Sequence, residues 1–336
     1  MTTTGADIDY ASAIRVLEDA RSVTIVCHVQ PDADTLGSGL ALALVLGRRG
    51  VPVRVSFAEP AELAVTLRTL PGLQYLVAPA EVPDEVDLLV TVDCGSVSRL
   101  GSLADRLPRA ATTLVIDHHR SNTRFGALNL VDPAAVSTTT VLTGLLDTWG
   151  VPIDAELAHC LFAGLATDSG SFRWVTPGTH SLAERLLDTG IDGAAITRGL
   201  MDTHPFTWLR MLSAVLASAR LETDVYGGTG LVSAFVQADD LVGLRQEEAE
   251  SVVDIVRSTA EAGIAAVFKE VRGRQGARRR WTVSLRSTDS GPGTDDGADV
   301  AAIATELGGG GHRYAAGYTT YGEPEDVLDQ LRAALS

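Results

Sequence analysis

Apolar and polar positions in the first half of the chain follow two alternating patterns. Short apolar runs, typical of strands buried on both faces, are separated by longer stretches with helical periodicity such as Leu36–Arg48. The runs that predict buried strands are Val23–Cys27, Val51–Phe57, Leu88–Val92 and Thr113–Ile116. Strands that alternate with helices in this way predict a larger N-terminal α/β domain with a mainly parallel sheet flanked by helices.

The pattern changes after Pro152. Up to about Arg220 it is largely helical, and the expected helices are Leu157–Leu165, His180–Leu187 and Trp208–Ala219. From Gly230 onward strand patterns return, at Leu231–Val236, Ile264–Val271, Trp281–Arg286 and Tyr314–Thr320, interleaved with helical patterns at Glu247–Ser258 and Glu325–Ala334. The second half therefore predicts a helical connector followed by a smaller C-terminal α/β domain.

The length of 336 residues exceeds what one hydrophobic core comfortably supports, so two domains are expected. We predict a first domain at residues 1–192, a helical connector at 193–220 and a second domain at 221–336. Within the second domain, Arg272–Arg280 is rich in Arg and Gly, and Thr288–Gly297 is rich in Gly, Ser and Asp. Both compositions predict mobile loops.

Charge and cysteine content limit the substrates and the cellular compartment that we expect. The net charge of −16 disfavours binding to a long duplex, so any nucleic-acid substrate is expected to be short. The uncharged apolar stretch Thr35–Gly47 is shorter than the roughly 18 apolar residues of a membrane span, and no basic-then-apolar leader precedes it. Three separate cysteines without a C-x-x-C pair argue against a disulfide framework or a zinc ribbon. We expect a cytoplasmic protein that does not bind membranes.

Acidic and histidine side chains follow the predicted strands of the first domain. His28 comes directly after the first strand, with Asp32 and Asp34 in the turn that opens the next helix. Asp93 follows Leu88–Val92, the triplet Asp117-His118-His119 follows Thr113–Ile116, and Asp168 lies in an expected glycine-bounded turn. Ligand-bearing residues of parallel α/β domains lie just beyond the carboxyl ends of the strands, in the crevice where strand order reverses.

Each of these residues taken alone has a structural alternative, because an Asp at a strand end is most often a helix cap or a turn residue. As a set at successive strand ends of one sheet, they predict a metal site. Carboxylates and imidazoles without thiolates suit manganese or a related first-row ion better than a structural zinc. Four aspartates also balance two divalent charges, and two ions about 3.5–4 Å apart can clamp the oxygens of a displacement at phosphorus. The candidate ligands are His28, Asp32, Asp34, Asp93, His118 and Asp168.

A second signal lies near the end of the chain, where four glycines, Gly308–Gly311, are followed by His312 and Arg313. Successive glycines let a backbone approach an anion closely and present its N–H groups. A flexible loop is the structural alternative. The pair Arg286-Ser287 at the end of a preceding strand favours phosphate or nucleotide binding.

The ordered set of motifs resembles a known family over almost the whole chain. The motifs are His28-x-x-Pro31-Asp32-x-Asp34-x-x-Gly37, the strand-end Asp93, Asp117-His118-His119, Asp168 and Gly-Gly-Gly-His312. They resemble the DHH phosphoesterases with a DHH-associated C-terminal domain. Length and layout are most similar to the nanoRNase and phosphoadenosine phosphate (PAP) phosphatase group, which includes cyclic-di-AMP phosphodiesterases.

The resemblance implies two Mn²⁺ ions per chain, with Mg²⁺ or Co²⁺ as substitutes, and a homodimer. It implies one ion held by His28, Asp32 and Asp93, and the other by Asp34, Asp93, His118 and Asp168. Asp93 would bridge the two ions, and His119 would face the substrate, where it is a candidate to bind the scissile phosphate or to assist the leaving oxygen. The nucleotide would be held by Arg286, Ser287, Gly310, Gly311 and His312. The polar insertion Thr288–Gly297 departs from the family pattern.

The function implied is hydrolysis of short oligoribonucleotides and of linear or cyclic dinucleotides such as pApA and cyclic-di-AMP to mononucleotides, and of PAP to AMP. An inorganic pyrophosphatase or exopolyphosphatase could share the first domain, but the Arg286-Ser287 pair and the glycine run argue for a nucleotide. A RecJ-like processive nuclease would need an additional strand-gripping domain, for which the chain is short. A non-catalytic nucleotide sensor is expected to have lost a metal ligand, and here all six are present.

Overall fold

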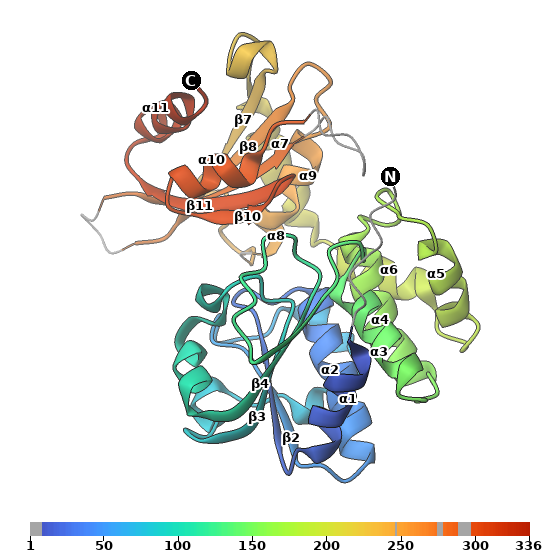
Figure 1. Cartoon of the computed structure of the whole chain (residues 1–336). Helices are drawn as coiled ribbons and strands as arrows, with labels where there is room; N and C mark the ends of the chain where they lie inside the picture. The colour runs from blue at the N-terminus through green and yellow to red at the C-terminus, as the bar shows by residue number, and fades with distance from the viewer. Residues whose placement is uncertain (1–8, 246, 274–277, 288–296) are drawn as a thin grey trace, which may run out of the picture. The chain divides into compact units, whose positions relative to one another are not determined.

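The computed structural model describes residues 9–245, 247–273, 278–287 and 297–336, and the chain divides into two compact units (Figure 1). The first unit spans Met1–Thr203 and the second His204–Ser336. The boundary falls inside the expected connector, so helix α6 (Gly193–Met201) belongs to the first unit and α7 (Phe206–Ala217) to the second. None of the helices in the described ranges combines the length and apolar character that crossing a membrane requires.

The first unit is built around a five-stranded sheet in which every neighbouring pair of strands is parallel. The strands lie in the order β2-β1-β3-β4-β5. Their bounds are β1 Val23–Cys27, β2 Val53–Ser56, β3 Val86–Val92, β4 Ala110–Asp117 and β5 Leu128–Val131. The chain moves outward from β1 to β2 and then returns to the other side of β1 for β3, so strand order reverses between β1 and β3. Ligands of open parallel sheets bind beyond the carboxyl ends of the strands at such a point.

Successive side chains of each strand enter different cores, as the period of two requires. Ile25 and Val90 pack in the core formed with the helices of the first unit, whereas Val26 and Leu89 pack on the opposite face against the 3-10 segment η4 (Val97–Arg109). The helices are α1 Tyr10–Asp19, α2 Ala33–Arg48, α3 Thr138–Thr148, α4 Ala155–Asp168, α5 Thr179–Leu187 and α6. Both faces of the sheet are therefore covered, as expected for a parallel sheet.

Helices α2 and α4 pack closely against each other. A Cβ atom on Gly37 of α2 would lie 2.5 Å from the backbone oxygen of Cys160 on α4, so only glycine permits this approach. Along α2 every residue from Ala33 to Leu46 is buried. The close packing brings the start of α2 near the end of α4, where Asp34 and Asp168 lie.

The second unit contains a six-stranded mixed sheet in the order β10-β11-β9-β8-β7-β6. Only β7 and β8 pair in parallel, and the other neighbours are antiparallel. The strands are β6 Arg220–Glu222, β7 Leu231–Val236, β8 Ile264–Val271, β9 Arg280–Ser287, β10 Gly310–His312 and β11 Ala315–Tyr321.

Each face of this second sheet has its own core. Phe268 and Trp281 pack with residues of α10 (Val300–Glu306) and α11 (Pro324–Ala334). On the opposite face, Val267 packs with α7 and α9 (Val252–Val256), which follows the short helix α8 (Glu247–Glu250). The second unit is therefore a three-layer α/β arrangement.

The structure confirms the predicted fold class: a parallel sheet flanked by helices and a second, smaller α/β unit. Three strands escaped prediction, β5, β6 and β10, because all are short and their sequences lack an apolar run of useful length. The helix predicted at Glu247–Ser258 is instead two short helices, α8 and α9. The predicted mobile loops lie largely outside the described residues, at 274–277 and 288–296.

Candidate active site

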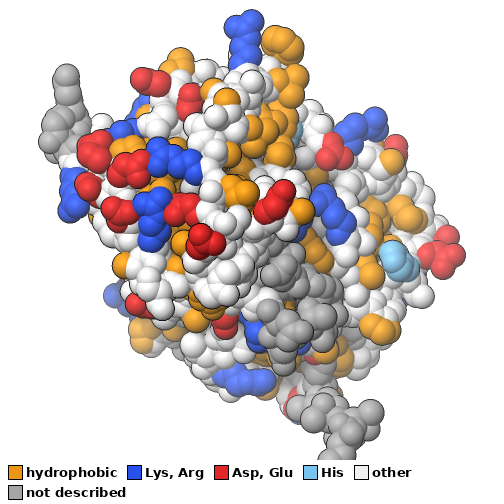
Figure 2. Space-filling model, turned by 90° about the horizontal axis from the view of Figure 1, so that it is seen from above, with side chains coloured by type: hydrophobic (Ala, Val, Ile, Leu, Met, Phe, Trp, Pro, Cys, Tyr) orange, Lys and Arg blue, Asp and Glu red, His pale blue; other side chains and the backbone are white. Residues whose placement is uncertain are grey.

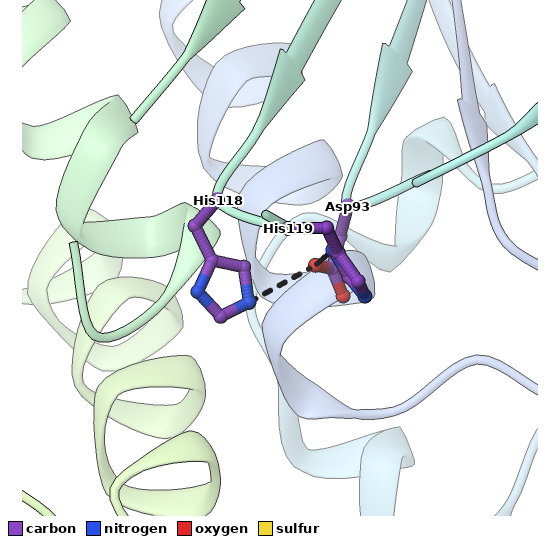
Figure 3. Close-up of side chains that lie close together, drawn as sticks. All are labelled: Asp93, His118 and His119. Atoms are coloured by element: carbon purple, nitrogen blue, oxygen red, sulfur yellow. Dashed lines mark ion pairs between the residues drawn. The ribbon is translucent and has the colours of Figure 1, made fainter. Parts of the chain in front are cut away.

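Imidazole and carboxylate side chains converge at the carboxyl edge of the parallel sheet. In each of three groups, the ligand atoms lie within 4.8 Å of one another. The groups are His28, Asp32 and Asp93; Asp34, His118 and Asp168; and Asp93, His118 and His119. Because the groups share members, all six predicted metal ligands and His119 form one cluster. Figure 3 shows the third group, with His118 and His119 close to the Asp93 carboxylate.

Four members of this cluster owe their position to neighbouring parallel strands. His28 follows β1, Asp93 follows β3, and His118 and His119 follow β4. Parallel neighbours end at the same edge of the sheet, so residues that are distant in sequence become adjacent there. Strand order reverses between β1 and β3, which places His28 and Asp93 on either side of that point.

The other members come from helix ends. Asp32 is the N-cap of α2, where its carboxylate accepts the N–H groups of Asp34 and Thr35, both at 3.0 Å. Asp34 lies in the first turn of α2. Asp168 is the last residue of α4, and the glycine-bounded turn expected around it begins only after the helix ends.

Backbone strain accompanies two of the candidate ligands. Asp93 has a φ of 58°, a left-handed conformation that non-glycine residues rarely adopt. After Asp168 the chain passes through three consecutive left-handed residues, Gly170, Ser171 and Phe172, with φ values of 58°, 57° and 62°. Each non-glycine residue in this region costs roughly 1–2 kcal/mol. Strain of this kind clusters at active sites, where the surrounding structure holds it in place.

The ring orientation of His28 and His118 suits metal ligands. The Nδ1 atom of His28 donates to the carbonyl oxygen of Val29 at 2.8 Å, and that of His118 to the carbonyl oxygen of Ala135 at 3.3 Å. A carbonyl oxygen only accepts, so Nδ1 carries the proton in each neutral ring, and Nε2 then offers its lone pair to a cation. Metal-binding histidines are oriented by this type of second hydrogen bond.

Distances within the cluster fit shared ions better than direct hydrogen bonds. The Nε2 atom of His28 lies 3.4 Å from Asp32 Oδ2 and 3.4 Å from Asp93 Oδ2. The Nε2 atom of His118 lies 3.2 Å from Asp168 Oδ2 and 3.7 Å from Asp93 Oδ1. Two atoms bound at about 2.1 Å to one ion lie roughly 3.0–3.4 Å apart. The two oxygens of Asp93 therefore face two different groups of ligands, so the donor set and spacing fit a pair of divalent cations.

Without cations, the cluster binds protons strongly. Although burial lowers the pKa of His28, Asp32 and Asp93 raise it to about 10. The pKa of His118 is likewise raised well above its usual value, mainly by Asp168, against the effect of burial. Both imidazoles therefore hold protons at neutral pH in the absence of metal, and these are the protons that a cation would displace.

The carboxylates show a matching excess of negative charge. Burial, followed by the charges of Asp168 and Asp93, raises the pKa of Asp34 well above its usual range. Burial likewise raises the pKa of Asp168, to about 6, although His118 opposes the change. Carboxylates that resist ionisation beside one another are stabilised when a divalent cation binds between them.

His119 is held from behind by a buried carboxylate. Its Nδ1 atom lies 2.6 Å from Oδ1 of Asp117, which also accepts the backbone N–H of His118 at 2.8 Å. Asn122 donates to Asp117 Oδ2 at 2.5 Å and to the carbonyl oxygen of Cys94 at 3.1 Å. This network fixes the His119 ring between the loops that follow β3 and β4.

The sequence analysis did not identify several residues that hold the candidate ligands in place. Asp117 was identified only as part of a motif and Asn122 not at all, although Asp117 holds His119 and Asn122 in turn holds Asp117. The first turn of α3, with Thr138 and Thr139, donates four hydrogen bonds to Asp34 and Asp93. In the sequence, the run Ser137–Thr140 precedes an apolar helical pattern, which is typical of the start of a helix. This pattern does not indicate which carboxylates the helix start contacts.

The candidate nucleotide-binding residues of the second unit lie on neighbouring strands. Arg286 on β9 is opposite Ala315 on β11, which is opposite His312 on β10. The next residue, Ser287, is buried, and its side chain leaves the opposite face of the sheet from that of Arg286, as the alternation along a strand requires. The side chain of His312 lies outside the described part of the structure.

The Arg286 guanidinium is half-buried, and burial lowers its pKa. Its Nη1 atom donates to the carbonyl oxygen of Leu285 at 3.0 Å. Within the described residues, no carboxylate lies at ion-pair distance from it. A partly desolvated cation without an anionic partner is costly, which makes Arg286 a suitable contact for an anion.

The consecutive glycines have different structural roles. A Cβ on Gly309 would lie 2.1 Å from the backbone oxygen of Gly317. Gly311 has a φ of 147°, and a Cβ there would lie 2.5 Å from the Cα of Ala316. By contrast, a Cβ on Gly310 would meet no described atom within 4 Å. Gly309 and Gly311 are therefore required by the fold, whereas Gly310 is not.

Comparison with known proteins agrees with this geometry. Residues 22–165 match the N-terminal domain of the DHH family, and residues 230–336 match the DHHA1 domain. The chain is 32% identical over 321 residues to the bifunctional oligoribonuclease and PAP phosphatase NrnA of Thermus thermophilus, covering 94% of this chain and 90% of that protein. The chain therefore belongs to the DHH family, with a DHHA1 domain, and is a phosphoric ester hydrolase.

Two further proteins are similar over nearly the full length. The bifunctional oligoribonuclease and PAP phosphatase NrnA of Bacillus subtilis is 24% identical over 332 residues, which cover 96% of each chain. A crystal structure of an exopolyphosphatase-related protein from Bacteroides fragilis has a TM-score of 0.84 at 24% identity, covering 100% of this chain and 97% of that one. The structural similarity confirms the fold, and the predicted resemblance to the nanoRNase and PAP phosphatase group is confirmed by the sequence relatives.

Proposed function

We propose that the chain is a two-manganese phosphodiesterase and phosphatase that acts on short nucleotides. Its substrates are short oligoribonucleotides, linear and cyclic dinucleotides such as pApA and cyclic-di-AMP, and PAP. The relatives named as oligoribonuclease and PAP phosphatase support this substrate class. The absence of thiolates from the three ligand groups favours manganese, with Mg²⁺ or Co²⁺ as substitutes.

The observation that carries the proposal is the position of Asp93. Its Oδ2 atom faces His28 and its Oδ1 atom faces His118, so one carboxylate serves two ligand groups. We assign His28, Asp32 and Asp93 to one ion, and Asp34, Asp93, His118 and Asp168 to the other. Bound there, the ions would supply an activated water molecule and neutralise charge on the phosphate oxygens.

His119 has a separate role. Its Nδ1 atom is held by Asp117, so the substrate contact that we propose falls to Nε2. From there it would bind the scissile phosphate or hold a proton for the leaving oxygen. Because Asp117 is fully buried and also bound by Asn122, the imidazole keeps its orientation through the reaction.

The second unit would recognise the rest of the nucleotide. We propose that Arg286 binds a phosphate that is not being cleaved, with the Gly310–Gly311 backbone and His312 completing that subsite. The side chain of Ser287 leaves the opposite face of the sheet, so we do not assign it to this contact. A guanidinium suits this contact because its planar fork matches phosphate oxygens. Gly310 supports the same assignment, since its missing side chain is not explained by packing.

The net charge of −16 favours short over long polyanions. On the face that Figure 2 draws, acidic and basic side chains are interspersed. We therefore propose that long duplex nucleic acid is not a substrate. The proposed homodimer is tested by sedimentation velocity of the metal-loaded protein.

Chromatographic product analysis tests the proposed function. The manganese-loaded protein is incubated separately with linear diadenylate, cyclic-di-AMP, PAP and pyrophosphate, beside an Asp93→Asn control. We expect mononucleotide from the nucleotides and no product from the control. Turnover of pyrophosphate alone would assign the chain to the pyrophosphatases. Tight nucleotide binding without any product would identify a sensor instead.

A further inference from the structure

The first turn of α3 is bound to a carboxylate from another helix. The first N–H groups of a helix have no partner within it and need an acceptor. Ser137, the N-cap, accepts one of them, from Thr140 at 3.1 Å. The N–H groups of Thr138 and Thr139 donate instead to Asp34, at 2.7 Å to Oδ2 and 2.9 Å to Oδ1.

The two threonine hydroxyls extend this contact to a second carboxylate. The hydroxyl of Thr139 donates to Asp34 Oδ1 at 2.8 Å. The hydroxyl of Thr138 donates to Asp93 Oδ1 at 2.9 Å. Thr138 therefore binds both carboxylates: its N–H group donates to Asp34 and its hydroxyl donates to Asp93. Helix capping accounts for the N–H contacts, but it does not account for the hydroxyl contact with Asp93.

Packing prevents Asp34 from moving away from this turn. A Cβ on Gly164 of α4 would lie 2.4 Å from Asp34 Oδ1 and 2.6 Å from Cγ2 of Thr139. Asp34 is fully buried, so no solvent replaces these donors. The Oδ1 atom is committed to the two Thr139 donors, which leaves the remaining lone pair of Oδ2 for a ligand.

We propose that Thr138 is a positioning residue that sets the separation of Asp34 and Asp93. Both aspartates are assigned to the ion held with His118, and Asp93 is also assigned to the other ion. Their separation therefore decides whether the Asp93 carboxylate can reach both cations. This inference rests on the proposed metal site. The Thr138 hydroxyl donates to Oδ1 of Asp93, whereas His28 attracts Oδ2. Without this hydroxyl, the carboxylate would lose a hydrogen bond that holds it against the attraction of His28. Partners that orient metal ligands typically contribute about 10- to 100-fold in metal affinity or activity.

Three substitutions on one helix test this role. Thr138→Val keeps the branched shape and removes the hydroxyl, whereas Thr138→Ser keeps the hydroxyl. Thr143→Val is the matched control, because Thr143 is also buried on α3 but its hydroxyl donates to the carbonyl oxygen of Thr139 at 2.8 Å. Calorimetric titration with manganese measures the number and affinity of bound ions, and circular dichroism checks folding.

We expect Thr138→Val to weaken binding of at least one manganese ion by about 10- to 100-fold and to lower kcat with pApA by a similar factor. Thr138→Ser and Thr143→Val should bind both ions with near wild-type affinity. Thr138→Ala should reproduce the loss if the valine variant does not fold. Wild-type manganese affinities in both Thr138→Val and Thr138→Ala would overturn the proposal. So would a loss of affinity in Thr143→Val equal to that in Thr138→Val. If wild-type protein binds two ions but cleaves no nucleotide, the proposed function fails while the calorimetric comparison still decides the role of Thr138.

Discussion

The two units hold their polar side chains in different ways. In the first unit, Asp34 and Asp93 are buried, and backbone or hydroxyl donors fix their oxygens. In the second unit, the Arg286 guanidinium donates to a backbone carbonyl, and no carboxylate of the described residues lies at ion-pair distance from it. Buried charges are costly unless they are compensated. On the proposed function, the first unit would be organised before any ligand arrives, whereas the second would complete its contacts with the substrate.

Sheet topology explains the contrast. In the parallel sheet the carboxyl ends of β1, β3 and β4 lie at one edge, so loops from distant parts of the chain meet there. In the second unit β9, β10 and β11 are antiparallel, and their residues lie opposite one another across the strands. The first arrangement gathers many ligands around a point. The second presents a row of groups along a surface, which suits an extended nucleotide.

The largest effect is expected from Asp93→Asn, which keeps the shape of the side chain and removes its charge. Asn also tolerates the left-handed conformation at this position, so the fold should persist. We expect kcat with pApA to fall by about a thousandfold, or about 4 kcal/mol. Steady-state kinetics at saturating manganese measure the loss. Activity within a few-fold of wild type would contradict the assignment of Asp93 to both cations.

Arg286→Gln tests the second unit. Loss of a buried charge contact to phosphate should raise KM by about a hundredfold, or about 2.7 kcal/mol, and leave kcat largely unchanged. The matched control is Arg280→Gln, because Arg280 lies on the same strand but is exposed. If both variants raise KM equally, Arg286 acts only through general electrostatic attraction.

The pH dependence of metal binding sharpens the contrast in charge. The pKa of His28 is raised to about 10 and that of His118 is raised as well, so both are protonated in the metal-free protein at neutral pH. A cation needs the neutral ring, so filling both positions should release at least the two imidazole protons per chain. Metal affinity at each position should therefore rise at least about tenfold per unit between about pH 6 and about pH 8.

Calorimetry in buffers of different ionisation enthalpy measures this release directly. A metal affinity that does not change with pH would show that the two imidazoles are already neutral before the ions bind.

Within the run Gly308–Gly311, Gly310→Ala should have the smallest effect. A Cβ there meets no described atom within 4 Å, so the free energy of unfolding should change by less than about 0.5 kcal/mol. If a substrate approaches this backbone, KM should still rise by about tenfold. Gly311→Ala is the contrasting variant, because its φ of 147° and the contact with Ala316 predict clear destabilisation. An unchanged KM in Gly310→Ala would leave the glycine run with a structural role alone.

Much of this organisation could be predicted from the sequence. Residues such as His28 and Asp93 directly follow apolar strands, and a parallel α/β pattern implies that such positions share one edge. The short strands β5, β6 and β10 were missed because their local patterns are weak. Thr138 could not be found, because its partners are 104 and 45 residues away and its own motif indicates only a helix start. Contacts of this kind depend on how α3 packs, which local sequence does not encode.

The central claim is that one carboxylate, Asp93, serves two divalent cations at the edge of the parallel sheet. Anomalous diffraction from crystals grown with manganese tests it most directly. We predict two anomalous peaks, both in contact with Asp93, one also bound by His28 and Asp32 and the other by Asp34, His118 and Asp168. A single peak, or peaks that do not contact Asp93, would contradict the account.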